Sequence, residues 1–137
     1  MSADAKGRWL GRALLASSIV LSAAGQLGMK AGMQELHALT ARGGALAAAS
    51  WSDLAPVIGW TFAGLSAYGL SLVCWLAVLV RYPLSYAYPL LGLAYVLVYA
   101  GATLWPRLAE PASVLRTGGT LLILAGVALV TLADRRR

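Results

Sequence analysis

Residues 17–30 have the sequence SSIVLSAAGQLGMK, an apolar segment in which a polar residue returns at every fourth position. These residues are Ser18, Ser22, Gln26 and Lys30. Positions four apart lie on one slowly drifting face of an α-helix, so the four side chains are predicted to form a polar stripe. A lysine at the centre of a membrane helix costs about 2.5 to 3.5 kcal/mol, and a polar cavity along the helix would relieve that cost.

The same stripe has a purely structural interpretation. The serine hydroxyls would bond to carbonyl groups of their own helix, Gln26 would pair across a helix interface, and Lys30 would extend to the membrane surface. The regular spacing of all four residues favours the cavity.

The remainder of the chain is equally apolar. It has 137 residues, of which 60% are hydrophobic and 12% are charged, and its mean hydropathy is +0.74. Soluble domains are about 25% charged. Four segments reach the ~20 residues needed to cross a bilayer, and they run from Trp9 to Gly32, Ala55 to Val80, Leu84 to Trp105 and Val114 to Ala133. The sequence therefore predicts an all-α membrane protein, with residues 1–137 forming a single four-helix transmembrane domain.

The net charge of +6 is explained by membrane orientation better than by nucleic-acid binding, because the basic residues flank the predicted helices. We expect the N- and C-termini to be cytoplasmic. Lys6, Arg8, Arg12, Arg81 and Arg135 to Arg137 would then lie inside, and Lys30, Arg42, Arg107 and Arg116 outside.

The third segment has an aromatic face. Tyr88, Tyr95 and Tyr99 fall on one side of the predicted helix, with Pro89 and Gly92 between them. The tyrosines are candidates for the wall of a substrate path or for ordinary packing at the interface. Pro89 removes a backbone hydrogen bond, so Pro89 and Gly92 are predicted to form a hinge.

In the fourth segment, Gly119 and Gly126 are seven residues apart. Small residues at this spacing let a second helix approach closely, and we expect a dimer interface there, with packing inside the chain as the alternative.

Titratable groups that could perform chemistry are scarce. The five carboxylates are predicted to lie in termini or loops, and Cys74 is the one cysteine. We find no spacing typical of a catalytic site, so we expect no enzyme, no cofactor and no metal. An exporter of cations needs an acid within the membrane, which makes that function a poor fit.

Three motifs resemble those of a known family: LSAAGQL at residues 21–27, YGLSLVCW at 68–75 and AYPLLGLAYVLV at 87–98. Together with the four helices, they resemble the EamA-like small multidrug resistance superfamily, and within it the subunits of the aminoarabinose undecaprenyl-phosphate flippase. By this resemblance, the membrane glutamate of the drug exporters corresponds to Ser22. The tyrosine of their AYA motif corresponds to Tyr88, and the tryptophan that follows it to Leu91. Their dimer-forming glycines correspond to Gly119 and Gly126.

The resemblance implies an antiparallel dimer, either with a related four-helix partner subunit or as a homodimer. It further implies a flippase in the bacterial inner membrane that moves a polyisoprenyl-phosphate-linked aminosugar to the periplasmic leaflet, for lipid A modification and polymyxin resistance. The residues expected to bind this substrate are Ser18, Ser22, Gln26, Lys30, Tyr88 and Tyr95. Membrane lipids would surround the protein. A cation exporter, a transporter of another lipid-linked sugar, and a non-transporting subunit that anchors a membrane glycosyltransferase are the alternatives.

Overall fold

The computed structural model describes residues 3–42, 49–108, 110, 111 and 113–134, and these residues form four helices. They are α1 (Ala3–Ala41), α2 (Trp51–Leu79), α3 (Leu84–Leu104) and α4 (Val114–Asp134). All four are long and apolar enough to cross a membrane. The prediction of an all-α membrane protein is therefore confirmed.

The first helix is longer than the predicted span of residues 9–32. Helix α1 has 39 residues, which corresponds to about 58 Å, and this exceeds the ~30 Å of a hydrocarbon core. The sequence predicts loops at Glu35 and Asp53, and both predictions are wrong, because Glu35 lies within α1 and Asp53 lies in the first turn of α2. The segment after Gly32 contains neither proline nor glycine before position 43, so nothing ends the helix earlier. Residues 43–48 of the predicted loop lie outside the described residues.

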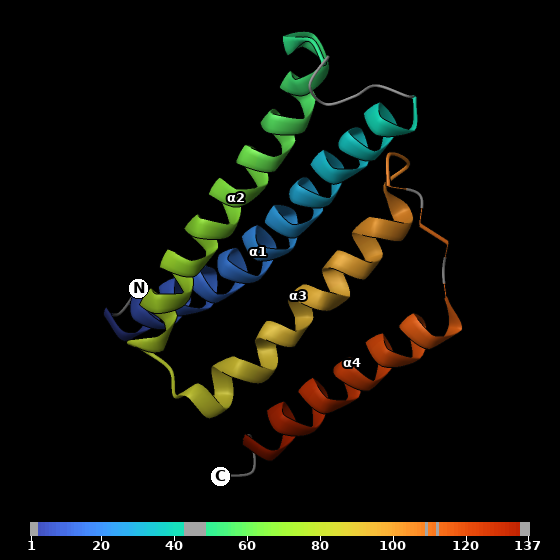
Figure 1. Ribbon diagram of the computed structural model, residues 1–137. Coiled ribbons are helices and arrows are strands. Elements are labelled where there is room, and N and C mark those ends of the chain that lie inside the picture. The colour runs from blue at the N-terminus through green and yellow to red at the C-terminus, as the bar shows by residue number, and fades with distance from the viewer. Residues whose placement is uncertain (1–2, 43–48, 109, 112, 135–137) are drawn as a thin grey trace.

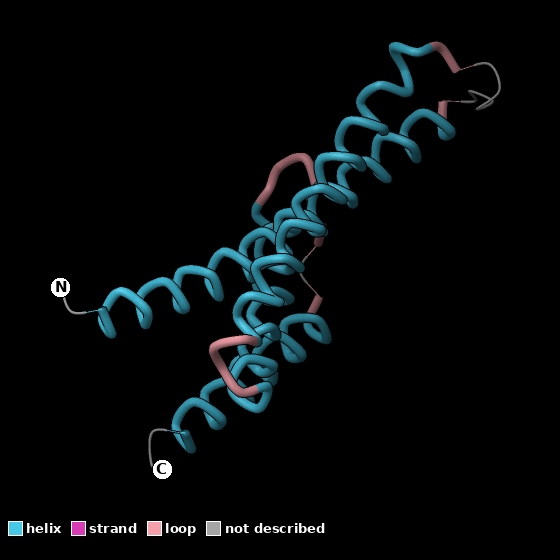
Figure 2. Tube along the Cα trace, turned by 90° about the vertical axis from the view of Figure 1, so that its left-hand side faces the viewer, coloured by secondary structure: helices cyan, strands magenta, loops and turns pink. Residues whose placement is uncertain are grey.

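The helices lie side by side in the order α2, α1, α3, α4 (Figure 1). A short turn at residues 80–83 joins α2 to α3, and there the N–H groups of Arg81 and Tyr82 donate to the carbonyl of Val78 at 2.9 and 3.0 Å. Helices α2 and α3 nevertheless touch each other little, since each packs on α1. In the view turned by 90°, the N-terminal part of α1 leaves the other helices at an angle (Figure 2).

Glycines set the distance between α1 and α2. A Cβ atom on Gly64 would lie 2.5 Å from the backbone nitrogen of Met29 and 2.6 Å from the carbonyl oxygen of Gly25. A Cβ on Gly28 would lie 3.0 Å from the Cα of Gly64. The two backbones are therefore in direct contact, which is how membrane helices pack closely without a hydrophobic driving force.

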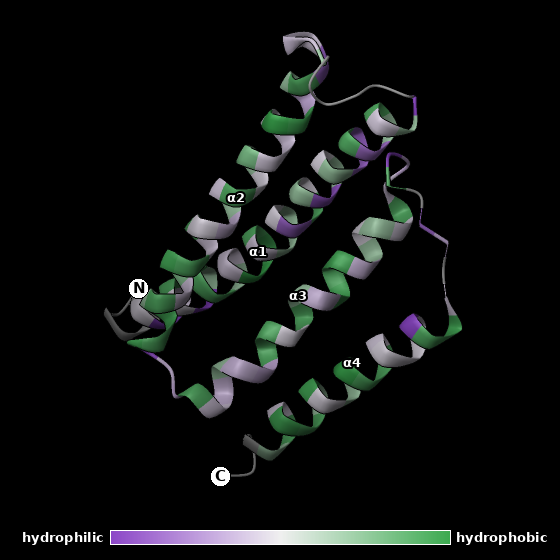
Figure 3. Cartoon of the chain, viewed as in Figure 1, coloured by the Kyte–Doolittle hydropathy of each residue, from purple (hydrophilic) through white to green (hydrophobic). Residues whose placement is uncertain are grey.

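The core is built mainly from small and β-branched side chains. Leu15 and Ile19 of α1 pack with Val78 of α2 and with Ala87 and Ala94 of α3. Hydrophilic positions gather on the C-terminal half of α1 and at the start of α4, whereas α2 and the body of α4 are largely hydrophobic (Figure 3). The apolar stretch of α4 has no buried residue, and this helix packs on α3.

Candidate functional site

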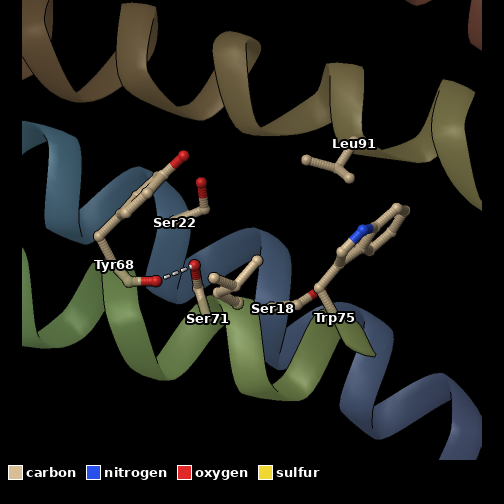
Figure 4. A pocket seen from close by; sticks show the side chains of 7 residues that line it. Ser18, Ser22, Tyr68, Ser71, Trp75 and Leu91 are labelled. Atoms are coloured by element: carbon tan, nitrogen blue, oxygen red, sulfur yellow. Dashed lines mark hydrogen bonds between the residues drawn. The ribbon is translucent and has the colours of Figure 1, made fainter. Parts of the chain in front are cut away.

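A cavity of about 170 Å³ lies where α1, α2 and α3 meet. The side chains of α1 and α2 rise toward α3, from which Leu91 points back into the cavity (Figure 4). The lining residues are Ser18, Ser22, Tyr68, Ser71, Leu72, Trp75 and Leu91.

Helix α1 contributes the first two members of the predicted polar stripe. Ser18 and Ser22 are 4% and 7% exposed. The Ser18 hydroxyl donates to the carbonyl of Leu15 at 2.8 Å, and the Gln26 amide donates to the Ser22 hydroxyl oxygen at 3.3 Å. Gln26 therefore touches the site through Ser22, without being one of the residues that line the cavity.

Helix α2 contributes a face that the sequence analysis did not assign to a site. Tyr68, Ser71 and Trp75 recur at intervals of three and four residues, so one side of the helix presents all of them. The Ser71 hydroxyl donates to the carbonyl of Tyr68 at 2.6 Å. The same helical periodicity that singled out Ser18 and Ser22 would have found this face, had it been applied to YGLSLVCW.

The polar groups of the cavity lining are neutral, namely hydroxyls and the indole N–H of Trp75, and none of its lining residues is acidic. Because Ser18 and Ser71 give their protons to backbone carbonyls, their oxygen lone pairs remain to accept hydrogen bonds. Ser22 accepts from Gln26, which leaves its own proton to donate. The cavity can therefore both accept from and donate to a ligand rich in hydroxyl or amino groups, against an aromatic wall formed by Trp75.

The predicted tyrosine wall lies beside this cavity. Tyr88 and Tyr95 are each 62% exposed, and neither is among the lining residues. Tyr88 reaches the cavity indirectly, since its ring makes an edge contact with Trp75 at 6.1 Å between centroids. The third tyrosine of that face, Tyr99, has its hydroxyl 2.6 Å from that of Thr117 on α4.

The predicted hinge residues lie in the N-terminal half of α3, and Pro89 is inside the helix. At Gly92, an added Cβ would lie 3.0 Å from a methyl group of Ile123 on α4. The small size of Gly92 therefore serves the packing of α4 on α3, a contact that the sequence analysis did not anticipate.

Lys30, the last member of the stripe, lies outside the cavity lining and forms an ion pair within the chain. Its Nζ lies 2.6 Å from Oε1 of Glu110, and an Arg116 nitrogen lies 2.8 Å from the other carboxylate oxygen. The hydrogen bond from Lys30, aided by the charges of Lys30 and Arg116, holds the pKa of Glu110 below its usual range, against a smaller opposing effect of burial.

A second polar contact reinforces this end of the molecule. Arg107 forms an ion pair with Glu35 and lies 5.0 Å above the ring of Trp60, which meets Trp105 edge to face. The connection between α3 and α4 is thereby held to α1 and α2.

The predicted interface glycines of α4 are open. Within the part of the chain that the structure describes, a Cβ on Gly119 or Gly126 would meet nothing within 4 Å. This face has room for another helix.

Comparison with curated proteins identifies the family. A protein of Shewanella sediminis, named as a probable 4-amino-4-deoxy-L-arabinose-phosphoundecaprenol flippase subunit ArnF, is 43% identical over an alignment covering 88% of this chain and 86% of that protein. Proteins of the same name from Serratia proteamaculans and Aeromonas hydrophila are 39% and 41% identical, and the alignments cover 84% and 82% of this chain and 87% and 74% of those proteins.

No family model matches the chain, and no solved structure matches it. The likeness to the small multidrug resistance superfamily therefore stays a prediction. The alignments to the curated relatives extend over most of both chains. On this evidence, the chain belongs to the family of the 4-amino-4-deoxy-L-arabinose-phosphoundecaprenol flippase subunit ArnF.

Proposed function

We propose that this protein is a subunit of a flippase that moves phosphoundecaprenol-linked 4-amino-4-deoxy-L-arabinose from the cytoplasmic to the periplasmic leaflet of the bacterial inner membrane. The observation that carries the proposal is the hydroxyl-lined cavity between α1, α2 and α3 in a chain of this family. The isoprenoid tail would stay in the lipid while the headgroup enters the cavity.

The chemistry of the cavity suits an aminosugar. The Ser18 and Ser71 oxygens accept hydrogen bonds from hydroxyl or ammonium groups, and Ser22 can donate to a sugar oxygen. Trp75 offers an apolar surface to the sugar ring. Each polar group that the headgroup brings into hydrocarbon would otherwise be unsatisfied, at a cost of several kcal/mol.

The complete transporter is proposed to contain a second four-helix chain, either a related subunit or another copy of this one. The curated relatives are named as subunits, and the open face of α4 around Gly119 and Gly126 offers room for a partner helix. The proposed orientation places both termini in the cytoplasm. The basic C-terminal residues 135–137, which contribute to this assignment, lie outside the described residues.

The test is a labelling experiment on intact cells with an amine reagent that does not cross the membrane. It quantifies aminosugar lipid exposed on the periplasmic side, relative to total aminosugar lipid. Ser18→Ala removes a hydroxyl from the cavity, and Ser17→Ala, on the exposed neighbouring residue, is the matched control. We expect deletion of the gene to reduce labelling strongly, and Ser18→Ala to slow it about 2- to 10-fold, the effect of one hydrogen bond.

Gln26→Leu removes the donor to Ser22 and is expected to slow transport while the protein still inserts. If labelling persists unchanged in the deletion strain, the protein does not carry this substrate. Resistance to cationic drugs conferred by the chain alone would instead favour a cation exporter, and a protein that tolerates loss of all cavity hydroxyls would favour an assembly subunit.

A further inference from the structure

We propose that a second cavity, at the N-terminal end of α1, binds the phosphate group of a membrane lipid. This cavity has a volume of about 270 Å³ and is lined by Arg8, Arg12, Tyr82, Pro83 and Tyr86. It shares no residue with the hydroxyl cavity. The inference rests on the proposed function in one respect, because the lipid class chosen as ligand is the polyisoprenyl phosphate proposed above.

Two guanidinium groups form one side of this cavity. Arg8 and Arg12 are four residues apart on α1, so they project from the same face of the helix, and both are exposed. A guanidinium presents its N–H donors as a planar fork that matches two oxygens of a phosphate. A pair of arginines on one face can therefore hold a single phosphate from two sides.

Two tyrosines also line this cavity. The rings of Tyr82 and Tyr86 are 5.6 Å apart with planes inclined by 32°. Tyr82 lies directly across Gly11, where an added Cβ would be 2.7 Å from the phenol oxygen. Because Gly11 has no side chain, the Tyr82 hydroxyl can lie against α1, one residue before Arg12. The cavity therefore contains a neutral hydrogen-bond donor as well as the guanidinium groups.

The charge distribution supports an anionic ligand. The ion pairs among the described residues involve Lys30 in the C-terminal half of α1, Arg107 in the connection between α3 and α4, and Arg116 at the start of α4. The lining of the N-terminal cavity contains two cations and no acid. Arg81 adds a third positive charge near this end, with its side chain donating to the carbonyl of Ala77 at 3.0 Å.

The position along α1 suits a lipid phosphate. Trp9, between the two arginines in sequence, is 69% exposed, and exposed tryptophans are enriched where a membrane meets water. Lipid phosphates lie at the same level. Arg12 precedes Ser18 by six residues, or about 9 Å along the helix axis. A lipid held at Arg12 by its phosphate would therefore have its headgroup close to the hydroxyl cavity.

The test measures lipid binding to the full-length protein in maltoside micelles, which contain no phosphate, by native mass spectrometry. The probe is a polyisoprenyl phosphate, and the corresponding polyisoprenol shows what the tail contributes alone. The double variant Arg8→Lys, Arg12→Lys keeps both charges, and hence the membrane orientation, but loses the guanidinium forks. Arg81→Lys is the matched control, because it makes the same change at the same end of the molecule outside the cavity.

We expect the phosphate lipid to bind and the polyisoprenol not to bind, and the double lysine variant to weaken binding about fivefold or more, since lysine cannot form the bidentate contact. Arg81→Lys should bind as the unchanged protein does. Equal binding by the double variant, or equal binding of the polyisoprenol, overturns the proposal. Gly11→Ala provides an independent check, because it displaces Tyr82 without touching a charge and is expected to weaken binding.

Two competitors identify the source of the phosphate. If phosphatidylglycerol displaces the probe, the site binds the phosphate of bulk membrane lipids as well as that of the polyisoprenyl lipid. If inorganic phosphate displaces it at the same concentration, the lipid assignment is overturned. Ser18→Ala should bind the probe normally, so loss of transport in that variant and loss of binding in the arginine variant are separate results.

Discussion

The ammonium group of Lys30 lies 2.6 Å from the carboxylate of Glu110, and this ion pair joins α1 to the connection between α3 and α4. Both side chains are about 30% exposed, at 31% and 28%. Lys30 is the last residue of the polar stripe of α1, so the ion pair lies at the end of that stripe. A phosphate that reached Lys30 would have to compete with Glu110.

The Lys30–Glu110 pair predicts a pH dependence of stability. The pKa of Glu110 is lowered in the folded protein, so its contribution is complete above the ordinary glutamate pKa and is lost as the pH falls below about 4. Because the pair is partly exposed, we expect on the order of 1 kcal/mol or less. Thermal unfolding in detergent, measured between pH 3 and 7, should show a smaller acid-induced decrease for Glu110→Gln. An identical decrease in both proteins would contradict this assignment.

The close packing around Gly64 predicts that two glycine substitutions in α2 change the free energy of unfolding by very different amounts. Gly64→Ala places a Cβ against backbone atoms of Met29 and Gly25, which cannot move independently of α1. We expect a loss of about 1 to 3 kcal/mol, as in other overpacked sites. Gly69 on the same helix has open space around it, so Gly69→Ala should be neutral or stabilising by about 0.5 to 1 kcal/mol. Unfolding midpoints of the two variants in detergent test this order.

The position of Tyr68 in the cavity lining predicts that its hydroxyl contributes to transport and that the hydroxyl of Tyr95 does not. Tyr68→Phe removes one hydroxyl from the cavity while keeping the ring, and the labelling assay should show transport about 2- to 10-fold slower. Tyr95→Phe makes the same chemical change outside the cavity lining, so transport should be unchanged. A loss in Tyr95→Phe alone would favour the tyrosine wall of α3 over the α2 face.

The open face of α4 predicts a separation between folding and assembly. An added Cβ at Gly119 or Gly126 would meet none of the described atoms within 4 Å, so replacing both glycines with leucine should leave the unfolding midpoint nearly unchanged. If a partner helix packs there, co-purification of a differently tagged partner or copy should fall sharply. Gly118→Leu, one residue away and also open, is the control for added bulk. If the double variant still co-purifies fully with its partner, α4 does not form the interface.

The sequence by itself predicts the helices of this protein and the residues that share a face of one helix, because both depend on neighbouring residues in the chain. Each of the four helices is recognisable because crossing a membrane requires about 20 apolar residues in succession. The burial of Ser18 and Ser22 on one face follows from helical periodicity within six residues of chain. The extension of α1 to Ala41 could also have been inferred, since no helix-breaking residue lies between Gly32 and that point.

Tertiary structure alone decided which faces meet. The pairing of Lys30 with Glu110, the contact of Gly92 with Ile123, and the approach of Tyr68 to Ser22 across two helices join residues far apart in the sequence. Periodicity places a residue on a face of its own helix, but the neighbour of that face depends on how all helices pack together. Here the direct backbone contact at Gly64 brings α1 against α2, and α3 then closes the cavity from the other side of α1.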